Sequence, residues 1–583
     1  MRRTATLLAL VTLGATGFFA IQPGLGVSLA PLGASLAASA SCQPTWPMYQ
    51  HDAAHSGAQA CSTIDSGSVA HLAPTWFVPT AQPVTATPSI VGGMVFVGDA
   101  GGTFYALDQT TGAVRWTLSV TNAANACHAA DEHAASYGEI TSSANVADVG
   151  GALGPTVFFG GGATLYALDA ATGACRWSEN LDPTHPSSPM EILSSPVIDQ
   201  STSPPEVIVG DDTNESPGPG VGEAGVQAFD ARDGTLMWRY EPERNAVVHS
   251  LATSAYGPDG QNDGCGDVWS SPALDTKFGT RGLVVFGTGN CPDATTARIN
   301  GDFSTSDGVF AIDAVTGNRV WSFFEPPNSY ANTSPNEPDG GDDDFGSSPV
   351  LARVAAPIPG DNGFTSGPGV NPPGKSAGGK GGTRSLVLEG SKSGYMYALD
   401  ETTGNEVWGM QVAQPGQTGS AAAGAIGGFL GAAAMGKSGG TPALFATSAI
   451  PAPLAGAGVN GTSATPDTSL AADPLRASSL HAIEAATGAV LWQQPLSSPS
   501  YAATTYVNGV VFAPGTTSFS VEAYDALNGE PLWAFPIGAA LSSGVAVVGS
   551  SVVFGAGTAT AGPQEVPPQA NGVWSFALAS QVP

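Results

Sequence analysis

The sequence predicts an all-β fold: an eight-bladed β-propeller of four-stranded antiparallel blades, closed by N- and C-terminal strands. Three observations lead to this fold class. A motif that ends in tryptophan recurs seven times, short apolar segments precede most of its copies, and isolated strand-like pieces stand near both chain ends. Only 11% of the 583 residues are charged, and the 77 glycines and 46 prolines suit short strands and tight turns better than helices.

Each copy of the motif is expected to form two strands joined by a turn. The shared pattern is A-x-[D/E]-x-x-x-G-x-x-x-W, and its copies end at Trp116, Trp177, Trp238, Trp321, Trp408, Trp492 and Trp533. The acidic residue and the glycine supply the chemistry of a tight turn. A large aromatic residue at the end of each second strand suits packing between neighbouring blades. We therefore assign these tryptophans, and acidic turn residues such as Asp108 and Asp169, a structural role.

Further strand-like segments complete the expected blades. MVFVG, TVFFG, EVIVG, LVVFG and SLVLEG stand upstream of copies of the motif, and several are introduced by Ser-Ser-Pro. Four strands per repeat are typical of a propeller blade.

The last blade is expected to combine both ends of the chain. GVAVVG, SVVFGAG and GVWSFAL supply three strands after the seventh copy, but no further G-x-x-x-W strand follows them. Residues 71–76, with the sequence HLAPTW, can supply the missing outer strand. This closure gives eight blades in a single domain over residues 41–583 and leaves no open sheet edge.

Residues 1–40 are expected to be a secretory signal peptide. Arg2 and Arg3 are followed by an apolar run from about Ala5 to Ala20, and the small residues 38–40 suit cleavage. Later in the sequence, no run of 18 or more apolar residues is long enough to span a membrane. The protein is therefore expected to be secreted or periplasmic.

The six cysteines favour disulfides, because an oxidising compartment follows from export. Neither C-x-x-C nor C-x-x-C-H occurs in the sequence, so neither a zinc knuckle nor covalently attached haem is supported. We expect neighbours in sequence to pair: Cys42 with Cys61, Cys127 with Cys175, and Cys265 with Cys291.

Charge and motif content exclude several classes of function. The formal net charge of −30 would repel the phosphate backbone of a nucleic acid. The sequence contains no G-x-S-x-G elbow, P-loop or strand-Gly-helix nucleotide motif, so hydrolase and nicotinamide-dependent functions have little support. An acidic run at Asp339, Asp342, Asp343 and Asp344 predicts a hydrated loop, with a surface Ca²⁺ site as the alternative.

The tryptophan repeat resembles the tryptophan-docking motif of quinoprotein alcohol dehydrogenases, which are eight-bladed propellers that bind pyrroloquinoline quinone (PQQ) and a divalent cation. The likeness covers nearly all of residues 41–583. In LVVFGTGN, Asn290 stands where the family has a cation ligand. Asp302 lies eleven residues before the repeat's Asp313, as the family's catalytic aspartate does. Phe303 replaces the family's asparagine after that aspartate.

The resemblance extends to three neighbouring segments. DVWSSPALD places Trp269 where the family has a tryptophan that stacks on the quinone. LEGSKSGYMYALD places Lys392 where the family has an Arg or Lys that reaches the quinone and substrate oxygens. The family's glutamate ligand lies in a loop of different length, which leaves Glu215 and Glu223 as candidates, with Glu215 preferred. DDDFGSSPV and WPMYQHDAAHSG are most similar to the polyvinyl-alcohol-dehydrogenase branch, and the adjacent cysteines of the small-alcohol branch are missing.

The resemblance implies an exported oxidoreductase that oxidises an alcohol, polymeric or secondary, with PQQ and Ca²⁺ as cofactors. Glu215, Asn290 and Asp302 would supply the oxygen ligands that Ca²⁺ prefers. Asp302 would also act as general base, while Trp269, Lys392 and Asn290 would contact the cofactor. Without a haem motif of its own, the chain would pass electrons to an external acceptor such as a cytochrome c.

Two alternatives stay open. A quinone-free propeller that serves as a binding or envelope-assembly scaffold would carry the same repeat, because fold does not determine function. In that case Asn290 and Asp302 would be ordinary turn residues after glycine, and Lys392 a solvated lysine. A hydrolase or lyase on the same fold is a more distant alternative.

Overall fold

The computed structural model describes residues 44–125, 127, 135–151, 153–185, 188–213, 222–249, 265–289, 308–324, 344–355, 383–413, 428–449, 478–557 and 571–579. Every strand lies within the unit Thr45–Pro583. The expected signal peptide, residues 1–40, lies outside the described residues.

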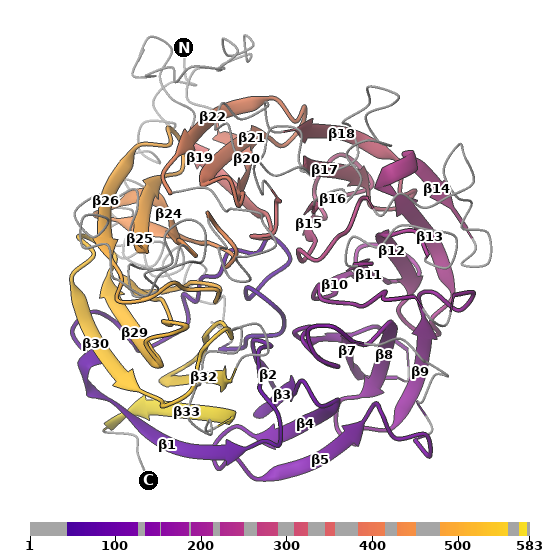
Figure 1. Ribbon diagram of the computed structural model, residues 1–583, viewed down its shortest axis with the longest axis horizontal. Coiled ribbons are helices and arrows are strands. Elements are labelled where there is room, and N and C mark those ends of the chain that lie inside the picture. The colour runs from indigo at the N-terminus through magenta and orange to yellow at the C-terminus, as the bar shows by residue number, and fades with distance from the viewer. Residues whose placement is uncertain are drawn as a thin grey trace, which may run out of the picture. The chain divides into compact units, whose positions relative to one another are not determined.

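Eight antiparallel sheets of the described chain follow one another around a central axis, each with its first strand innermost (Figure 1). The predicted eight-bladed propeller is confirmed. Blades one and two are β2 (Ser89–Val91), β3 (Met94–Gly98), β4 (Thr103–Asp108) and β5 (Val114–Ser119), then β6 (Asn145–Asp148), β7 (Pro155–Gly161), β8 (Thr164–Asp169) and β9 (Cys175–Asn180). Blades three and four are β10 (Val197–Asp199), β11 (Glu206–Asp211), β12 (Gly225–Asp230), β13 (Leu236–Glu241) and β14 (Ala246–Val248), then β15 (Ala273–Asp275), β16 (Leu283–Gly287), β17 (Gly308–Asp313) and β18 (Arg319–Phe324).

Blades five to seven repeat the four-stranded order. They are β19 (Val350–Ala355), β20 (Thr383–Gly390), β21 (Tyr395–Asp400) and β22 (Glu406–Gln411); β23 (Ala434–Ser438), β24 (Thr441–Thr447), β25 (Ser479–Glu484) and β26 (Val490–Pro495); and β27 (Thr505–Val507), β28 (Val510–Phe512), β29 (Ser520–Asp525) and β30 (Pro531–Pro536). The sequence patterns did not predict the fifth strand of blade three, β14, which pairs with β13 outside the repeat motif.

Blade eight joins the two ends of the chain, as predicted. Its strands are β31 (Ala546–Val548), β32 (Ser551–Ala556), β33 (Gly572–Leu578) and, outermost, β1 (Leu72–Pro79). β1 pairs antiparallel with β33, from Leu72 opposite Leu578 to Pro79 opposite Gly572. The indigo β1 and the yellow β33 lie side by side in Figure 1. The helices of the described chain are two 3₁₀ turns, η1 (Val69–His71) and η2 (Pro242–Arg244), and none of its helices is long and apolar enough to cross a membrane.

The repeat tryptophans dock neighbouring blades together. An indole N–H donates to a backbone carbonyl in the next blade at 2.8–3.2 Å for Trp76, Trp116, Trp177, Trp238, Trp321, Trp408 and Trp492. Trp76 belongs to β1, so the N-terminal strand also supplies the docking residue of blade eight. Trp533 instead packs against Phe576 of blade eight, with ring centroids 5.4 Å apart.

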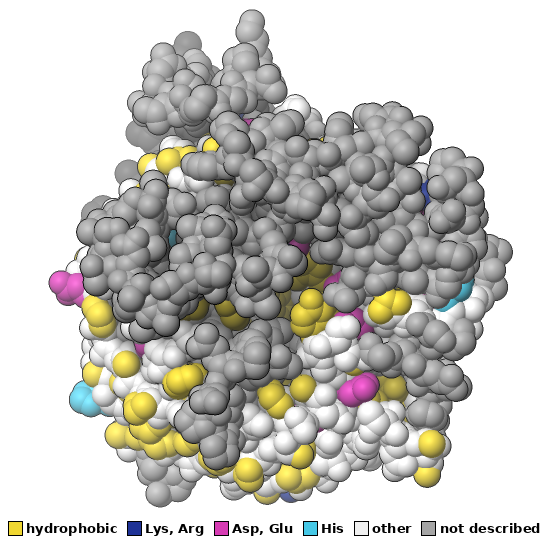
Figure 2. All heavy atoms as spheres, in the orientation of Figure 1, with side chains coloured by type: hydrophobic (Ala, Val, Ile, Leu, Met, Phe, Trp, Pro, Cys, Tyr) yellow, Lys and Arg dark blue, Asp and Glu magenta, His cyan; other side chains and the backbone are white. Residues whose placement is uncertain are grey.

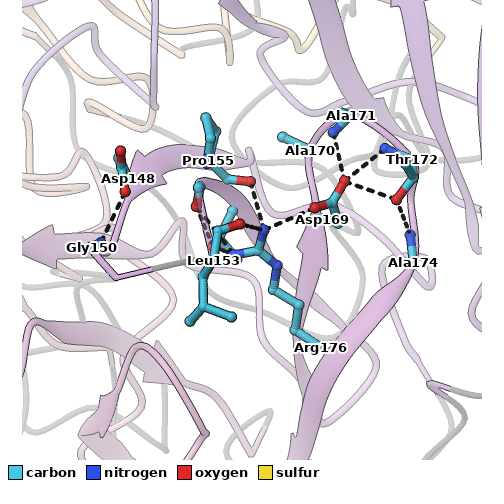
Figure 3. Close-up of polar contacts among 12 residues, drawn as sticks. Asp148, Gly150, Leu153, Pro155, Asp169, Ala170, Ala171, Thr172, Ala174 and Arg176 are labelled. Carbon is cyan, nitrogen blue, oxygen red and sulfur yellow. Dashed lines mark hydrogen bonds and ion pairs between the residues drawn. The ribbon is translucent and has the colours of Figure 1, made fainter.

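The acidic residue of the repeat closes its turn, as Figure 3 shows for blade two. One carboxylate oxygen of Asp169 accepts hydrogen bonds from the Ala171 N–H (3.1 Å), the Thr172 N–H (2.9 Å) and the Thr172 hydroxyl (2.8 Å). Its other oxygen accepts a 2.9 Å bond from the Arg176 guanidinium. These bonds satisfy the backbone of the turn, and the predicted structural role is confirmed.

One N-terminal segment, Trp46–Gly57, lies along the inner edges of the blades. Its carbonyls accept hydrogen bonds of 2.6–2.9 Å from first-strand N–H groups of six blades, those of Ile90, Val146, Leu274, Leu351, Met435 and Tyr506. An innermost strand has no sheet neighbour on the axis side, so its backbone groups need another partner. The segment supplies that partner, and in Figure 1 indigo ribbon crosses the middle of the ring.

Of the three predicted disulfides, the structure confirms Cys127–Cys175, with an S–S distance of 2.03 Å. Cys61 and Cys265 are also disulfide-bonded. Their predicted partners, Cys42 and Cys291, lie outside the described residues.

Replacing Gly404 by alanine should lower the free energy of unfolding by about 2–4 kcal/mol, because two penalties add. Gly404 has a φ of +69°, which strains an alanine, and the added methyl group would lie 2.5 Å from Cε3 of the docking Trp321. Thermal unfolding followed by circular dichroism measures the loss. Gly509→Ala is the control, because Gly509 has a φ of +89° but open space around it. Equal shifts in both variants would show that the ring contact contributes nothing.

Candidate functional site

Two of the predicted site residues lie in connections between strands. Trp269 is in the connection that leads into blade four, and Lys392 is in the turn between β20 and β21 of blade five. Trp269 stands shortly before β15, and Lys392 follows β20. Because strands alternate in direction within a blade, the start of its first strand and the end of its second meet at one end of the propeller. Asp344, just before β19, therefore reaches the same end.

Trp269, Asp344 and Lys392 form a compact group there. The Lys392 ammonium lies over the Trp269 ring, with its Nζ 5.3 Å from the ring centroid. It also forms an ion pair with the Asp344 carboxylate. The Lys392 and Asp344 side chains are only 15% and 3% exposed, so this pair is largely removed from water. A cation held against an aromatic face is a favourable electrostatic arrangement.

Two glycines allow the Trp269 ring to sit where it does. A methyl group added to Gly346 would lie 1.5 Å from Cη2 of Trp269, and one added to Gly289 would lie 3.1 Å from its Nε1. Atoms that are not bonded to each other cannot lie 1.5 Å apart. The Trp269 ring can therefore occupy this place only because Gly346 has no side chain.

Asp267 joins the stems of two loops to the segment that carries Trp269. Its carboxylate accepts hydrogen bonds from the N–H and the hydroxyl of Thr213, both at 2.7 Å. Its backbone carbonyl accepts a 2.9 Å bond from the Gly289 N–H. Thr213 ends the described part of the chain before Glu215, and Gly289 directly precedes Asn290. The stems that lead to these two predicted ligands therefore meet two residues from Trp269.

Glu223, the second candidate for the glutamate ligand, lies in an ionic cluster of blade three. Its carboxylate is buried, with Oε1 3.8 Å from Nε of Arg244. Arg244 also lies 3.3 Å from Glu241, whose other oxygen is 3.6 Å from Arg239. Burial, and then the charges of Glu243 and Glu241, raise the pKa of Glu223 to about 8 against the opposing effect of the arginines. A carboxyl group beside an arginine is poorly suited to bind a cation.

The other predicted ligands, Glu215, Asn290 and Asp302, lie outside the described residues. Within the ranges that the structure describes, no three His, Cys, Asp or Glu side chains form a group that could hold a metal ion. Of the predicted site residues, the structure therefore describes Trp269, Lys392 and the alternative ligand Glu223.

Asp344 is a site residue that the sequence patterns missed. The acidic run predicted a hydrated loop, but Asp344 is only 2% exposed and pairs with Lys392, so that prediction is wrong for this residue. Asp339, Asp342 and Asp343 lie outside the described residues. The available signal was position: Asp344 directly precedes the FGSSPV segment that leads into β19.

Glu389 is a second residue that the patterns missed. It lies near the end of β20, three residues before Lys392, and is 2% exposed. Among the described residues, neither of its carboxylate oxygens has a hydrogen-bond partner. A methyl group on Gly287 would lie 2.5 Å from its Oε1, so the carboxyl packs against the end of β16. Burial raises the pKa of Glu389 well above its ordinary value, and an unpaired buried carboxyl group is costly when charged.

Replacing Glu389 by glutamine should stabilise the protein increasingly as the pH rises. The unfolded glutamate loses its proton near pH 4.3, whereas the folded one keeps it to a much higher pH. Wild-type stability from this group is therefore fully present at acid pH and falls as the pH rises toward the folded pKa. We expect the thermal midpoint of the variant to exceed that of wild type at pH 9 and to differ little from it at pH 4.5. Thermal midpoints at both pH values test this.

The control for that experiment is Glu530→Gln, which changes an exposed glutamate on the surface of blade seven. As a surface substitution, it should change the thermal midpoint little at either pH. A Glu389→Gln difference that is equally flat would show that Glu389 is ionised in the folded protein at neutral pH.

Two family models match the chain. Residues 46–324 match the model described as "Glucose/ethanol/alcohol dehydrogenase, beta-propeller domain", and residues 392–562 match the model described as "Outer membrane protein assembly factor BamB". The first match contains Trp269, Asn290 and Asp302, and the second begins at Lys392.

The chain is similar in sequence to quinoprotein dehydrogenases. It is 24% identical over 388 residues to the quinohemoprotein alcohol dehydrogenase of Comamonas testosteroni, covering 63% of this chain and 46% of the relative. It is 25% identical over 344 residues to the polyvinylalcohol dehydrogenase of a Pseudomonas species, covering 56% of this chain and 45% of the relative. The chain thus spans just under half the length of these curated relatives.

A solved structure shares the fold. The crystal structure of the Comamonas testosteroni quinohemoprotein alcohol dehydrogenase superposes with a TM-score of 0.65 at 20% identity, covering 94% of this chain and 82% of that one. At this identity the superposition supports the propeller fold.

Proposed function

We propose that the chain is a member of the family of propellers related to the PQQ-dependent alcohol dehydrogenases, and that it is an exported quinoprotein that oxidises an alcohol. The observation that carries this proposal is the junction at Asp267. The stems of the Glu215 and Asn290 loops both bond to Asp267, and Trp269 follows it by two residues. A scaffold function gives no reason for the stems that lead to two predicted ligands to meet beside Trp269.

The described residues suit the proposed cofactor. PQQ is a planar aromatic quinone that carries carboxylates, and it supplies the hydride-accepting carbonyl when bound. The Trp269 ring offers a surface for stacking, and the Lys392 ammonium over it offers a charge that attracts carboxylate and quinone oxygens. Trp269 and Lys392 would thus hold and orient the cofactor.

The proposed roles of the remaining residues follow from their chemistry. Glu215, Asn290 and Asp302 would bind Ca²⁺ through carboxylate and amide oxygens. Glu223 is the weaker candidate because of its arginine neighbour. Asp302 would take the hydroxyl proton of the alcohol onto its carboxylate as general base. Lys392 would hold an oxygen of the substrate beside that base, so that the proton transfer occurs in a fixed geometry.

The substrate and the acceptor follow as finer proposals. We place the chain nearest the polyvinyl-alcohol branch, so a polymeric or secondary alcohol is the proposed substrate. The proposed electron acceptor is an external protein such as a cytochrome c. A basic acceptor suits the formal net charge of −30, and on the described part of the face in Figure 2 few Lys or Arg side chains are visible.

The alternative function is a quinone-free propeller that serves as a binding or envelope-assembly scaffold. The match of residues 392–562 to the assembly-factor model favours it. In that case Trp269 and Lys392 would be loop residues that pack together without a ligand.

Titration of metal-stripped protein with PQQ, with and without Ca²⁺, separates the two functions. Tryptophan fluorescence reports binding, and reduction of a dye in the presence of primary, secondary and polymeric alcohols reports turnover. We expect Ca²⁺-dependent quenching that is lost in Trp269→Ala or Asp302→Ala. Trp574→Phe is the matched control, because Trp574 lies in β33 of blade eight and should leave quenching unchanged. No binding at tens of micromolar PQQ would support the scaffold.

A further inference from the structure

The ion pair of Asp344 and Lys392 differs from the other lysine and arginine pairs of blades four and five. Among the described pairs of these blades, the arginine side chain is 58% exposed in Arg281–Asp313, 57% in Arg353–Asp275 and 23% in Arg384–Asp400. Lys392 is 15% exposed and Asp344 3%. Burying two charges costs more desolvation energy than the pair usually returns, and apolar residues would stabilise such a place equally well. A buried pair therefore points to a role other than stability.

Asp344 holds Lys392 at two points. Its carboxylate pairs with the Lys392 ammonium, and its backbone carbonyl accepts a 2.9 Å hydrogen bond from the Lys392 N–H. The next residue, Phe345, donates its N–H to the Thr288 carbonyl at 3.1 Å, two residues before Asn290. Asp344 is thereby tied to Lys392 and, through the neighbouring Phe345, to the stem that leads to Asn290.

A lysine without such a partner would not stay over the Trp269 ring. Its side chain has four flexible carbons, and its strongly hydrated ammonium tends to reach for water while the stem lies on apolar surface. The cation–π contact alone is weak when the cation can be hydrated. The Asp344 carboxylate supplies the directed attraction that keeps Nζ 5.3 Å from the ring centroid.

We propose that Asp344 is the positioning residue of the site: it holds the Lys392 ammonium over the Trp269 ring, so that the bound cofactor meets a charge already in place. This deepens the proposed function, on which its catalytic meaning rests. A charge that is fixed before binding costs no reorganisation when charge develops on a reacting oxygen. The acidic run around Asp344 thus contributes one buried carboxylate to the site.

The first test needs no cofactor. Wild-type protein and Asp344→Asn are treated with an amine-acetylating reagent, and the acetylation rate of Lys392 is followed by peptide mass spectrometry with the exposed Lys277 as internal reference. Removing one partner of a buried pair frees the other, so we expect Lys392 to react roughly tenfold faster or more in Asp344→Asn. Asp344→Glu keeps the charge and should restore most of the protection. An unchanged rate in Asp344→Asn would overturn the proposal, whatever the protein binds.

The second test measures PQQ affinity in Ca²⁺ buffer by quenching of tryptophan fluorescence. We expect roughly tenfold weaker binding in Asp344→Asn, partial recovery in Asp344→Glu, and no further loss when Lys392→Met is added to Asp344→Asn, because the two residues act as one unit. Asp275→Asn, which breaks a pair of the same two blades whose arginine is 57% exposed, should bind PQQ as wild type does. Additive losses would contradict the proposal. If wild type binds no PQQ while Asp344→Asn still accelerates Lys392 acetylation, the proposed function fails and the positioning contact stands.

Discussion

Asp302→Asn should lower alcohol oxidation by PQQ-loaded, Ca²⁺-supplemented protein by roughly two to four orders of magnitude. An amide cannot accept the hydroxyl proton as a carboxylate does, so the proton transfer loses its base. The asparagine keeps an oxygen that can still bind Ca²⁺. We therefore expect PQQ-dependent fluorescence quenching to persist while dye reduction is lost, which separates the base from the ligand.

The matched control is Asp307→Asn, which removes a carboxylate five residues later in the same connection between β16 and β17. It should keep dye reduction within about threefold of wild type, as expected for a substitution outside the proposed set of catalytic residues. If Asp302→Asn retained activity within the same threefold range, Asp302 would not be the base. Equal losses in both variants would indicate a general effect of charge in this connection.

Gly346→Ala should weaken PQQ binding by at least roughly tenfold, because it moves the ring on which the cofactor would stack. The new methyl group would lie 1.5 Å from Cη2 of Trp269, so the indole must leave its place. Overpacking of this kind costs about 1–3 kcal/mol, and each 1.4 kcal/mol is about tenfold in affinity. Fluorescence titration with PQQ measures the loss, and a shifted tryptophan emission spectrum of the free protein reports the ring movement.

Gly67→Ala provides the control for that experiment. Gly67 has ordinary van der Waals surroundings, with Asp65 Oδ1 3.5 Å from an added methyl group. It should change neither PQQ affinity nor the emission spectrum. If Gly346→Ala bound PQQ as tightly as wild type despite a shifted spectrum, Trp269 would not be the stacking residue.

The architecture could be predicted from the sequence because each blade repeats a local pattern. Each copy of the motif contains the alternating strand residues, the Asp and Gly of the turn and the closing tryptophan within about a dozen residues. The local sequence is therefore enough to predict the structure of each copy. The same logic predicted blade eight. The C-terminal part of the chain has three strands without an outer partner, and the HLAPTW segment near the N-terminus can supply that outer strand. The Cys127–Cys175 disulfide was also predicted correctly, from neighbouring positions in an even set.

The candidate site was predictable only in part. A resemblance identified Trp269 and Lys392, and the structure brings them together across blades four and five. Asp344 was misread as part of a hydrated acidic run, because its burial and its pairing with Lys392 depend on a residue 48 positions away. Glu389 looked like one residue in an apolar strand, and only the packing of β20 against the end of β16 shows its carboxyl buried there.

The sequence by itself determined the repeating blades, their tryptophan contacts and the joining of the two chain ends, because these depend on patterns that are local or complementary. Only the tertiary structure decided which charges are buried and paired, namely Asp344 with Lys392 and Glu223 beside Arg244. It also decided that the segment Trp46–Gly57 lies along the inner strands. Burial and pairing arise from surfaces that distant segments bring together. The cost of removing a charge from water therefore appears only once the blades are assembled.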